Sequence, residues 1–152
     1  MMTILFFAIA MSMMILTQEQ TQAVEIPVVL TEIKTDQTQI DIDSLEILAK
    51  CVEAEAGNQD QLGKRLVVDV ILNRVDSERF PDDIVSVISQ ENQFTVWSNG
   101  MLQKAKPTED TFEAIQTELD KRTDTQIMFF TAKHYNKYCI PAYVHGDHYF
   151  GY

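Results

Sequence analysis

Residues 41–57 read DIDSLEILAKCVEAEAG and carry the signals of one amphipathic helix. Asp43 is a suitable N-cap, Glu46 follows at the spacing of a capping box, and Gly57 stands where helices commonly end. One apolar stripe recurs at the three- and four-residue spacing of a helix that packs on a core, formed by Leu45, Leu48, Ala49, Val52 and Ala56. The stretch therefore predicts a helix that ends at Gly57 with this stripe facing the core.

Two glutamates near the end of this helix fall on different faces. Glu53 shares the outer face with Glu46 and Lys50, whose alternating charges favour an exposed surface. Glu55 lies on the apolar side at the helix C-terminus, where burial and the helix dipole both raise a carboxyl pKa. A carboxyl that stays protonated near neutral pH is the general acid that glycosidic-bond cleavage requires. The pattern alone also allows Glu55 to reach out of the last turn and form an ordinary ion pair.

Length and charge limit the classes of function. The chain has 152 residues and a formal net charge of −11, which predicts a single folded domain that is large enough for a hydrophobic core. Nucleic acid is not expected as a partner, because phosphate binding depends on clustered Lys and Arg. The sequence contains no basic run, internal repeat or glycine-rich phosphate loop. We expect a monomer.

The N-terminal region differs from the rest of the chain. Residues 3–16 form an apolar run of the length found in signal peptides, which is short for a membrane span. Thr21 and Ala23 place small residues at a suitable cleavage site, although no Lys or Arg precedes the run. Residues 1–23 are thus predicted to be a signal peptide or an uncleaved membrane anchor, with a buried helix as the alternative. The rest divides into a linker, 24–42, and a domain, 43–152, that is exported to the extracellular space, the periplasm or the cell wall.

The cysteines and histidines give little indication of a metal or cofactor. Cys51 and Cys139 are compatible with one disulfide in an exported protein or with two separate buried thiols. Cys51 lies in mid-helix with no neighbouring histidine, which favours packing over nucleophilic catalysis. The histidines are scattered and show neither Cys-x-x-Cys nor His-Glu-x-x-His spacing, so we expect no metal and no cofactor.

The remaining sequence predicts a helix-dominated α+β domain. A second helix from Asp60 to about Val75 is apolar almost all round, as expected for a central buried helix. A short helix follows Asp82 and Asp83 and reaches about Ser89, and another is expected from Thr108 to Arg122. Residues 126–131 and 142–150 read as two β segments that form a small sheet or hairpin near the C-terminus.

Two further features are ambiguous from the sequence. The segment Asn92–Trp97 is predicted to be a loop whose amides suit sugar hydroxyls and whose rings suit pyranose faces, or else a hydrophobic latch on a helix. On the first interpretation Trp97 contacts substrate. His148 lies between aromatic and acidic residues, and a histidine in such a place is either structural or catalytic.

Five short motifs occur in a recognisable order. They are ILAKCVEAEAG at 47–57, VILNRV at 70–75, RFP at 79–81, QF at 93–94 and GDHYF at 146–150. Together they resemble the SleB/CwlJ family of bacterial cell wall hydrolases, and the resemblance runs over about residues 45–152. Asp69 departs from the family pattern, which usually has a small apolar residue there.

The resemblance implies a lysozyme-like, lytic-transglycosylase-like fold that acts on peptidoglycan glycan strands. In that family the glutamate of the Glu-Ala pair is the catalytic acid, and this position corresponds to Glu55. By motif position the resemblance also places the following residues around a substrate groove, with the last at its far wall: Asn73, Arg74, Gln93, Phe94 and His148.

The number of carboxylates indicates the mechanism. A glycosidase of the usual retaining or inverting kind needs a second carboxylate across the scissile bond, whereas a lytic transglycosylase can use one. Asp60 and Asp69 are the only nearby candidates for that second carboxylate, so the sequence favours a transglycosylase over a water-dependent muramidase or glucosaminidase. A non-catalytic glycan-binding module on the same scaffold is the other class, and a disulfide-bonded adhesion domain is a third.

Overall fold

The structure, a computed structural model, describes residues 40–152. The expected signal peptide or anchor at 1–23 and nearly all of the expected linker lie outside the described residues. Within 40–152 no helix has the length and apolar character needed to cross a membrane.

Helix α1, Ile42–Ala56, forms where the apolar stripe predicted it. Its N-cap is Asp41, not Asp43: Asp41 has an extended backbone, and its Oδ1 accepts a hydrogen bond of 2.9 Å from the Ser44 backbone N–H. Asp43 instead lies in the first turn, where the helix dipole favours an acid. The expected stripe is buried, and Gly57 is the C-cap.

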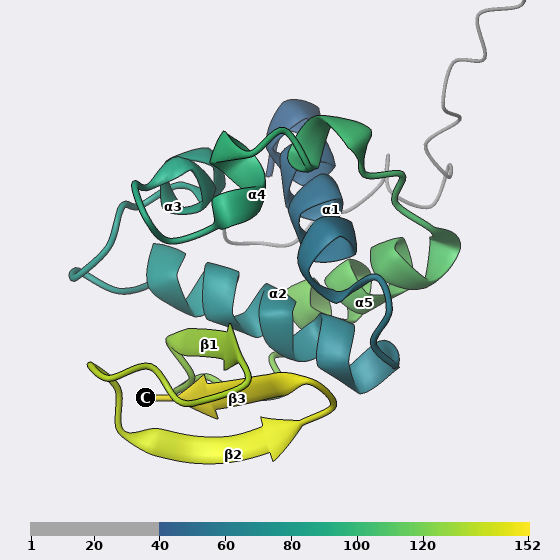
Figure 1. Cartoon of the computed structure of the whole chain (residues 1–152). Helices are drawn as coiled ribbons and strands as arrows, with labels where there is room; N and C mark the ends of the chain where they lie inside the picture. The colour runs from purple at the N-terminus through teal and green to yellow at the C-terminus, as the bar shows by residue number, and fades with distance from the viewer. Residues whose placement is uncertain (1–39) are drawn as a thin grey trace, which may run out of the picture.

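Helix α2, Gln61–Val75, runs through the middle of the domain (Figure 1). Asp60 caps it by accepting a hydrogen bond of 2.8 Å from the Gly63 backbone N–H, as the sequence predicts. Helices α1, α3 (Ile84–Ser89) and α5 (Glu109–Asp120) pack on it, and the C-terminal sheet covers its other side. This position explains why α2 is apolar almost all round.

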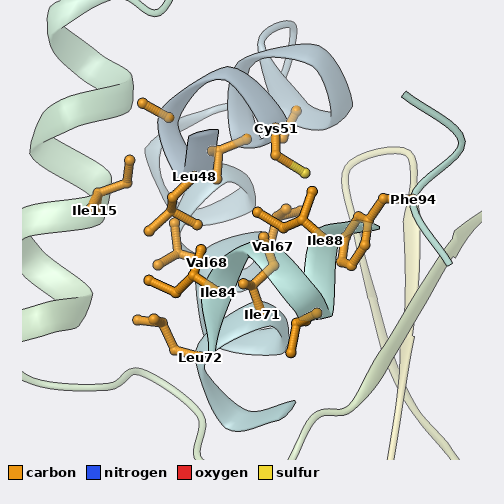
Figure 2. Packing of buried hydrophobic residues seen from close by; sticks show 14 of the residues in the cluster. Leu48, Cys51, Val67, Val68, Ile71, Leu72, Ile84, Ile88, Phe94 and Ile115 are labelled. Atoms are coloured by element: carbon orange, nitrogen blue, oxygen red, sulfur yellow. The ribbon is translucent and has the colours of Figure 1, made fainter. Parts of the chain in front are cut away.

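The main core lies between α1, α2, α3 and α5. Figure 2 shows its side chains interdigitating, with Cys51 on the side toward Ile88 and Phe94. The labelled members come from every surrounding helix and are Leu48, Cys51, Val67, Val68, Ile71, Leu72, Ile84, Ile88, Phe94 and Ile115. A smaller cluster joins α2 to the sheet through Leu66, Val70, Ile127 and Phe150.

The segment between α3 and α5 contains two short helical turns. They are α4, Thr95–Ser98, and the 3₁₀ helix η2, Leu102–Lys104. The prediction of a loop over Asn92–Trp97 is therefore wrong in its second half. Helix α5 follows Thr108 as expected, but it ends at Asp120 and not at Arg122.

The C-terminal sheet has three antiparallel strands in the order β1-β3-β2, namely β1 (Phe129–Ala132), β2 (Pro141–His145) and β3 (His148–Gly151). The second predicted β segment, 142–150, is thus a hairpin and not one strand. Its turn contains Gly146 at a φ of +53°, a conformation that favours glycine. The predicted class, a helix-dominated lysozyme-like α+β domain with a small C-terminal sheet, is confirmed.

Residues 133–140 connect β1 to β2 and cross over the central strand β3 (Figure 1). The rings of Tyr135 and Tyr149 pack edge to face with centroids 5.2 Å apart. A Cβ added to Gly151 would overlap the side chain of Cys139. In β3, Tyr149 and Gly151 face away from the buried His148 and Phe150. The crossover therefore lies on the outer face of the sheet.

Candidate active site

Glu55 occupies the last turn of α1 and is half-buried. Burial raises the pKa of its carboxyl above the ordinary glutamate value. Within residues 40–152 this carboxyl accepts no hydrogen bond that would oppose the shift. Glu55 thus combines partial access to solvent with a carboxyl whose charged form is disfavoured by burial.

Glu53 has a different role from the one its sequence position predicts. It is half-buried, and its Oε2 accepts hydrogen bonds from the backbone N–H of Thr108 at 3.3 Å and from the hydroxyl of Thr111. Thr108 itself makes no side-chain capping bond. Glu53 therefore stabilises the N-terminus of α5 from the neighbouring helix, and the expectation that it is merely exposed is corrected.

His148 lies next to the end of α1 although it is far from Glu55 in sequence. Its ring is buried between Phe130 and Phe150, with centroid distances of 5.0 and 5.9 Å. Burial lowers the pKa of His148, and the charge of Asp147 and the backbone carbonyl of Glu55 act in the opposite direction. Nδ1 is buried and has no hydrogen-bond partner within the described part of the chain. The first residue of β3 is thereby brought to the backbone of the candidate acid.

The β2–β3 turn holds this arrangement by contacting the loop between α1 and α2. His145 Nε2 lies 2.7 Å from Asp60 Oδ1, while the Gln59 side chain donates to Asp147 Oδ2 at 3.0 Å and accepts from the Asp147 backbone N–H at 3.1 Å. The positive φ of Gly146 favours glycine here, and an added Cβ would also displace the end of the Gln59 side chain. These contacts were not predicted from the sequence, although the Gly-Asp pair at 146–147 marks the turn.

Asn73 was expected around the substrate groove, and the structure shows its side chain in structural contacts. Its amide donates hydrogen bonds to the carbonyls of Asp124 and Ile127 at 2.8 and 3.0 Å, and its Oδ1 accepts from Arg122 at 3.2 Å. The side chain is buried, and these bonds occupy both its nitrogen and its oxygen. Asn73 therefore anchors the segment before β1 to α2.

Arg74, which was also expected around the groove, is buried. Its guanidinium carbon lies 5.0, 5.3 and 5.5 Å from the ring centroids of Phe80, Phe94 and Phe129. Nε donates to the Met128 carbonyl at 2.7 Å, whereas the buried Nη1 has no partner within residues 40–152. Burial lowers the pKa of Arg74 to about 10, which still leaves it charged at neutral pH.

The three residues expected from the segment around α4 have different environments. Phe94 is buried, and its ring lies 6.0 Å from that of Phe130, so it belongs to the core. Trp97 is half-buried and packs against the core, while Gln93 is exposed. Only Gln93 and Trp97 thus retain surface that a ligand can reach.

Both cysteines are free thiols. Cys51 is in the core, where burial and then the charge of Glu55 raise the pKa of its thiol well above the ordinary value. Such a thiol is a poor nucleophile. Cys139 lies in the crossover against Gly151. Of the two alternatives, the structure has separate thiols and not a Cys51–Cys139 disulfide, although only Cys51 is fully buried.

The two acids considered as partners for Glu55 have other contacts. Asp60 caps α2 and pairs with His145. Asp69 is fully buried between α2 and α5, where its Oδ2 accepts from the Asp124 backbone N–H at 2.8 Å. No group of three or more His, Cys, Asp or Glu side chains within residues 40–152 is arranged to hold a metal ion.

Comparison with known proteins identifies relatives of the whole domain. The catalytic domain of the germination-specific lytic transglycosylase SleB from Bacillus anthracis is similar, with a TM-score of 0.67 and 23% identity over 76% of this chain and 98% of that chain. The catalytic domain of the SleB protein from Bacillus cereus has the same TM-score and 22% identity over 76% of this chain and 94% of that chain. These similarities support the fold.

The sequence comparisons identify the family. The spore cortex-lytic enzyme of Halalkalibacterium halodurans is 33% identical over 60 residues, which are 40% of this chain but only 18% of that enzyme. A sequence model of the family described as Cell Wall Hydrolase matches residues 58–151, a range that begins just after Glu55. The predicted resemblance is confirmed, and the chain belongs to the Cell Wall Hydrolase family.

Proposed function

We propose that this enzyme is a lytic transglycosylase that cleaves peptidoglycan between N-acetylmuramic acid and N-acetylglucosamine, with Glu55 as its acid and then its base. The observation that carries the proposal is the environment of Glu55. Its carboxyl is half-buried, its pKa is raised, and it is not used as a structural acceptor, in contrast to Glu53.

The chemistry needs one proton that is given and then taken back. Protonated Glu55 donates to the glycosidic oxygen as the bond to the muramic C1 breaks, and the substrate's 2-acetamido group stabilises the positive charge that develops there. The Glu55 carboxylate then removes the proton of the muramic C6 hydroxyl, whose oxygen closes on C1. The product is a 1,6-anhydro sugar, and Glu55 is protonated again.

A single-carboxylate mechanism agrees with the surroundings of Glu55. The retaining and inverting mechanisms require a second acid on the other side of the scissile bond. Asp60 is held by Gly63 and His145, and Asp69 is enclosed between two helices. Neither carboxylate contributes to the raised pKa of Glu55.

The residues around Glu55 divide into supporting and contacting groups in this proposal. His148 and the β2–β3 turn position the end of α1, and Arg74 with Phe94 supports the adjoining core. Gln93 and Trp97 are the proposed contacts to the sugar chain. We further propose that the enzyme acts as a monomer after export to the cell wall.

Product analysis tests the proposal. Purified protein is incubated with peptidoglycan, and the soluble products are identified by mass spectrometry for wild type, Glu55→Gln and Glu53→Gln. We expect anhydro-muropeptides from wild type and Glu53→Gln and none from Glu55→Gln. Reducing-end products that disappear in Glu55→Gln would replace the transglycosylase with a hydrolase. If no protein released soluble products from several types of wall, a non-catalytic glycan-binding module would remain.

A further inference from the structure

The C-terminal sheet differs in charge from the rest of this acidic protein. Although the net charge is −11, residues 125–146 contain no Asp or Glu. The same stretch contains Lys133, Lys137, His134 and His145. The two lysines therefore give this segment a positive charge of its own, while His145 pairs with Asp60 of the loop between α1 and α2.

The crossover 133–140 presents these residues on a supported loop. Its first half is held by Tyr135 on Tyr149 and by a hydrogen bond from the Thr131 hydroxyl to the His134 carbonyl. Asn136 stabilises the second half through two hydrogen bonds. Its Oδ1 accepts from the backbone N–H of Tyr138 at 2.9 Å, and its backbone carbonyl accepts from the backbone N–H of Cys139 at 3.2 Å. The loop is thus fixed to the outer face of the sheet.

Exposed apolar and basic side chains occur both on this loop and on strand β2. Tyr138 is 77% exposed, Ile140 71% and Val144 49%. The Lys137 ammonium lies 4.6 Å from the centroid of the Tyr138 ring, and Lys133 is also exposed. We call Lys133, His134, Lys137, Tyr138, Ile140 and Val144 the crossover surface.

We propose that the crossover surface is a second binding site for peptidoglycan, where it takes sugar rings and the free carboxylates of the peptide stems. This inference rests on the proposed function and adds a docking site apart from Glu55. The Tyr138 ring offers a flat face to a pyranose, and the lysines supply the charge complementary to carboxylates. The rest of the domain is repelled by an anionic wall, so this surface also sets the orientation of approach.

Other anionic partners fit this surface less well. Recognition of an acidic membrane typically uses four to eight basic residues, and the crossover contributes only Lys133 and Lys137 beside His134. Binding to nucleic acid likewise depends on clustered Lys and Arg that neutralise several phosphates. A glycan with scattered carboxylates matches both the sparse charge and the exposed ring.

Sedimentation with insoluble peptidoglycan tests the proposal. All proteins carry Glu55→Gln, so that the polymer stays intact, and the sacculi are treated with hydrofluoric acid to remove phosphate polymers. We expect Lys133→Glu with Lys137→Glu to weaken binding about tenfold, and Tyr138→Ala to weaken it further. The matched control is Lys104→Glu with Lys106→Glu, an equal charge change at exposed lysines outside the crossover, which should have little effect.

Several outcomes would overturn the proposal. They are an equal loss of binding in the control pair, unchanged binding in the crossover variants, loss of wild-type binding after the acid treatment, or a crossover effect on phosphatidylglycerol vesicles but not on sacculi. Amidation of the sacculus carboxyls should lower wild-type binding, and unchanged binding would argue against the stem carboxylates.

The test separates this proposal from the proposed function. In a background that retains Glu55, the crossover variants should cleave short soluble glycan fragments as fast as wild type does. If wild type did not cleave but the crossover variants alone lost binding to sacculi, the catalytic proposal would fail and the binding site would stand. Slower cleavage of the soluble fragments would place the crossover in the catalytic site and overturn the claim of a separate surface.

Discussion

Carboxyl groups are buried or half-buried at the end of α1 and between α2 and α5, and the hydrogen bonding differs between these two places. At the end of α1, Glu55 is half-buried and its carboxyl accepts no hydrogen bond within residues 40–152. Between α2 and α5, Asp69 and Glu118 are fully buried, and each accepts hydrogen bonds from neighbouring groups. Glu118 Oε1 accepts from Arg65 Nε at 2.5 Å and from the Thr123 hydroxyl at 2.6 Å.

Asp69 and Glu118 form what we call the inner pair, and their pKa shifts follow from these contacts. Burial and a hydrogen bond to Glu118 raise the pKa of Asp69 to about 8, so Asp69 holds the proton. Burial also tends to raise the pKa of Glu118, but hydrogen bonds from Asp69, Thr123 and Arg65 keep this pKa below the usual value. Asp69 is therefore the neutral member of the pair and Glu118 the charged one.

The comparison shows that a raised pKa alone does not identify a catalytic acid. Burial raises the pKa of both Asp69 and Glu55, but the proton of Asp69 is enclosed and donated to Glu118. Glu55 keeps access to solvent and has no such acceptor within residues 40–152. These two differences are the reasons for proposing Glu55, and not Asp69, as the catalytic acid.

The largest expected effect is on the rate of cleavage. Glu55→Gln should lower kcat about 10²- to 10⁴-fold, the contribution of general acid–base catalysis, while the midpoint of thermal unfolding stays within a few degrees. In wild type, activity should fall as pH rises through the raised pKa of Glu55, because the protonated acid is lost. Release of soluble products between pH 4 and 9 and a melting curve would measure both. A Glu55→Gln protein with wild-type kcat would contradict this assignment.

Substitution in the inner pair should lower stability and leave the rate of cleavage unchanged. Glu118→Ala leaves Arg65, Thr123 and the protonated Asp69 without their acceptor, so we expect a loss of about 3 kcal/mol in the free energy of unfolding. The protein that remains folded should cleave at the wild-type rate. Urea unfolding and activity per folded molecule would test this expectation. If kcat fell with unchanged stability, Glu118 would have to be reassigned to the catalytic site.

The sequence predicts the helical part of the fold well because local signals agree with tertiary packing. The stripe of α1, the all-round apolar α2 and the cap at Asp60 each specify one environment. The cap of α1 was misplaced because Asp41 and Asp43 are chemically equivalent there, and only backbone conformation separates them. The hairpin at 142–150 was read as one segment although the Gly-Asp pair at 146–147 is a local signal for its turn.

The role of Glu55 stays a prediction, but its environment could be read from the sequence. Periodicity distinguished Glu55 from Glu53 because the two residues point in different directions from one helix. The structural contacts of Asn73 and Arg74 could not be predicted because their partners, the carbonyls of residues 124–128, are more than forty residues away in the chain. Long-range contacts such as Gln59 with Asp147 leave no periodic pattern in a single sequence.

A smaller effect should appear in the pH dependence of stability. A carboxyl whose folded pKa is raised contributes stability that is fully present below its unfolded pKa and is lost as pH rises. For Asp69 the loss should extend from about pH 4 to about pH 8. Asp69→Asn can accept from Asp124 and donate to Glu118 without titrating, so its stability should vary less over this interval.

The control for this prediction is Asp82→Asn, which changes an exposed acid. It should leave the pH dependence of the wild-type unfolding free energy unchanged. Denaturant curves at several pH values would give both slopes. An Asp69→Asn protein that still lost stability steeply between pH 4 and 8 would show that another group carries the titration.

The smallest effect distinguishes the two neighbouring glutamates. Glu53→Ala removes the acceptor for the Thr108 backbone N–H and the Thr111 hydroxyl at the start of α5, and we expect a loss of about 1 kcal/mol in stability. Glu46→Ala is the control, because it removes only an exposed pair with Lys50 that contributes about 0.3–0.5 kcal/mol. Both variants should retain wild-type kcat, since neither touches Glu55. A fall in kcat for Glu53→Ala alone would mean that the N-terminus of α5 is coupled to the last turn of α1.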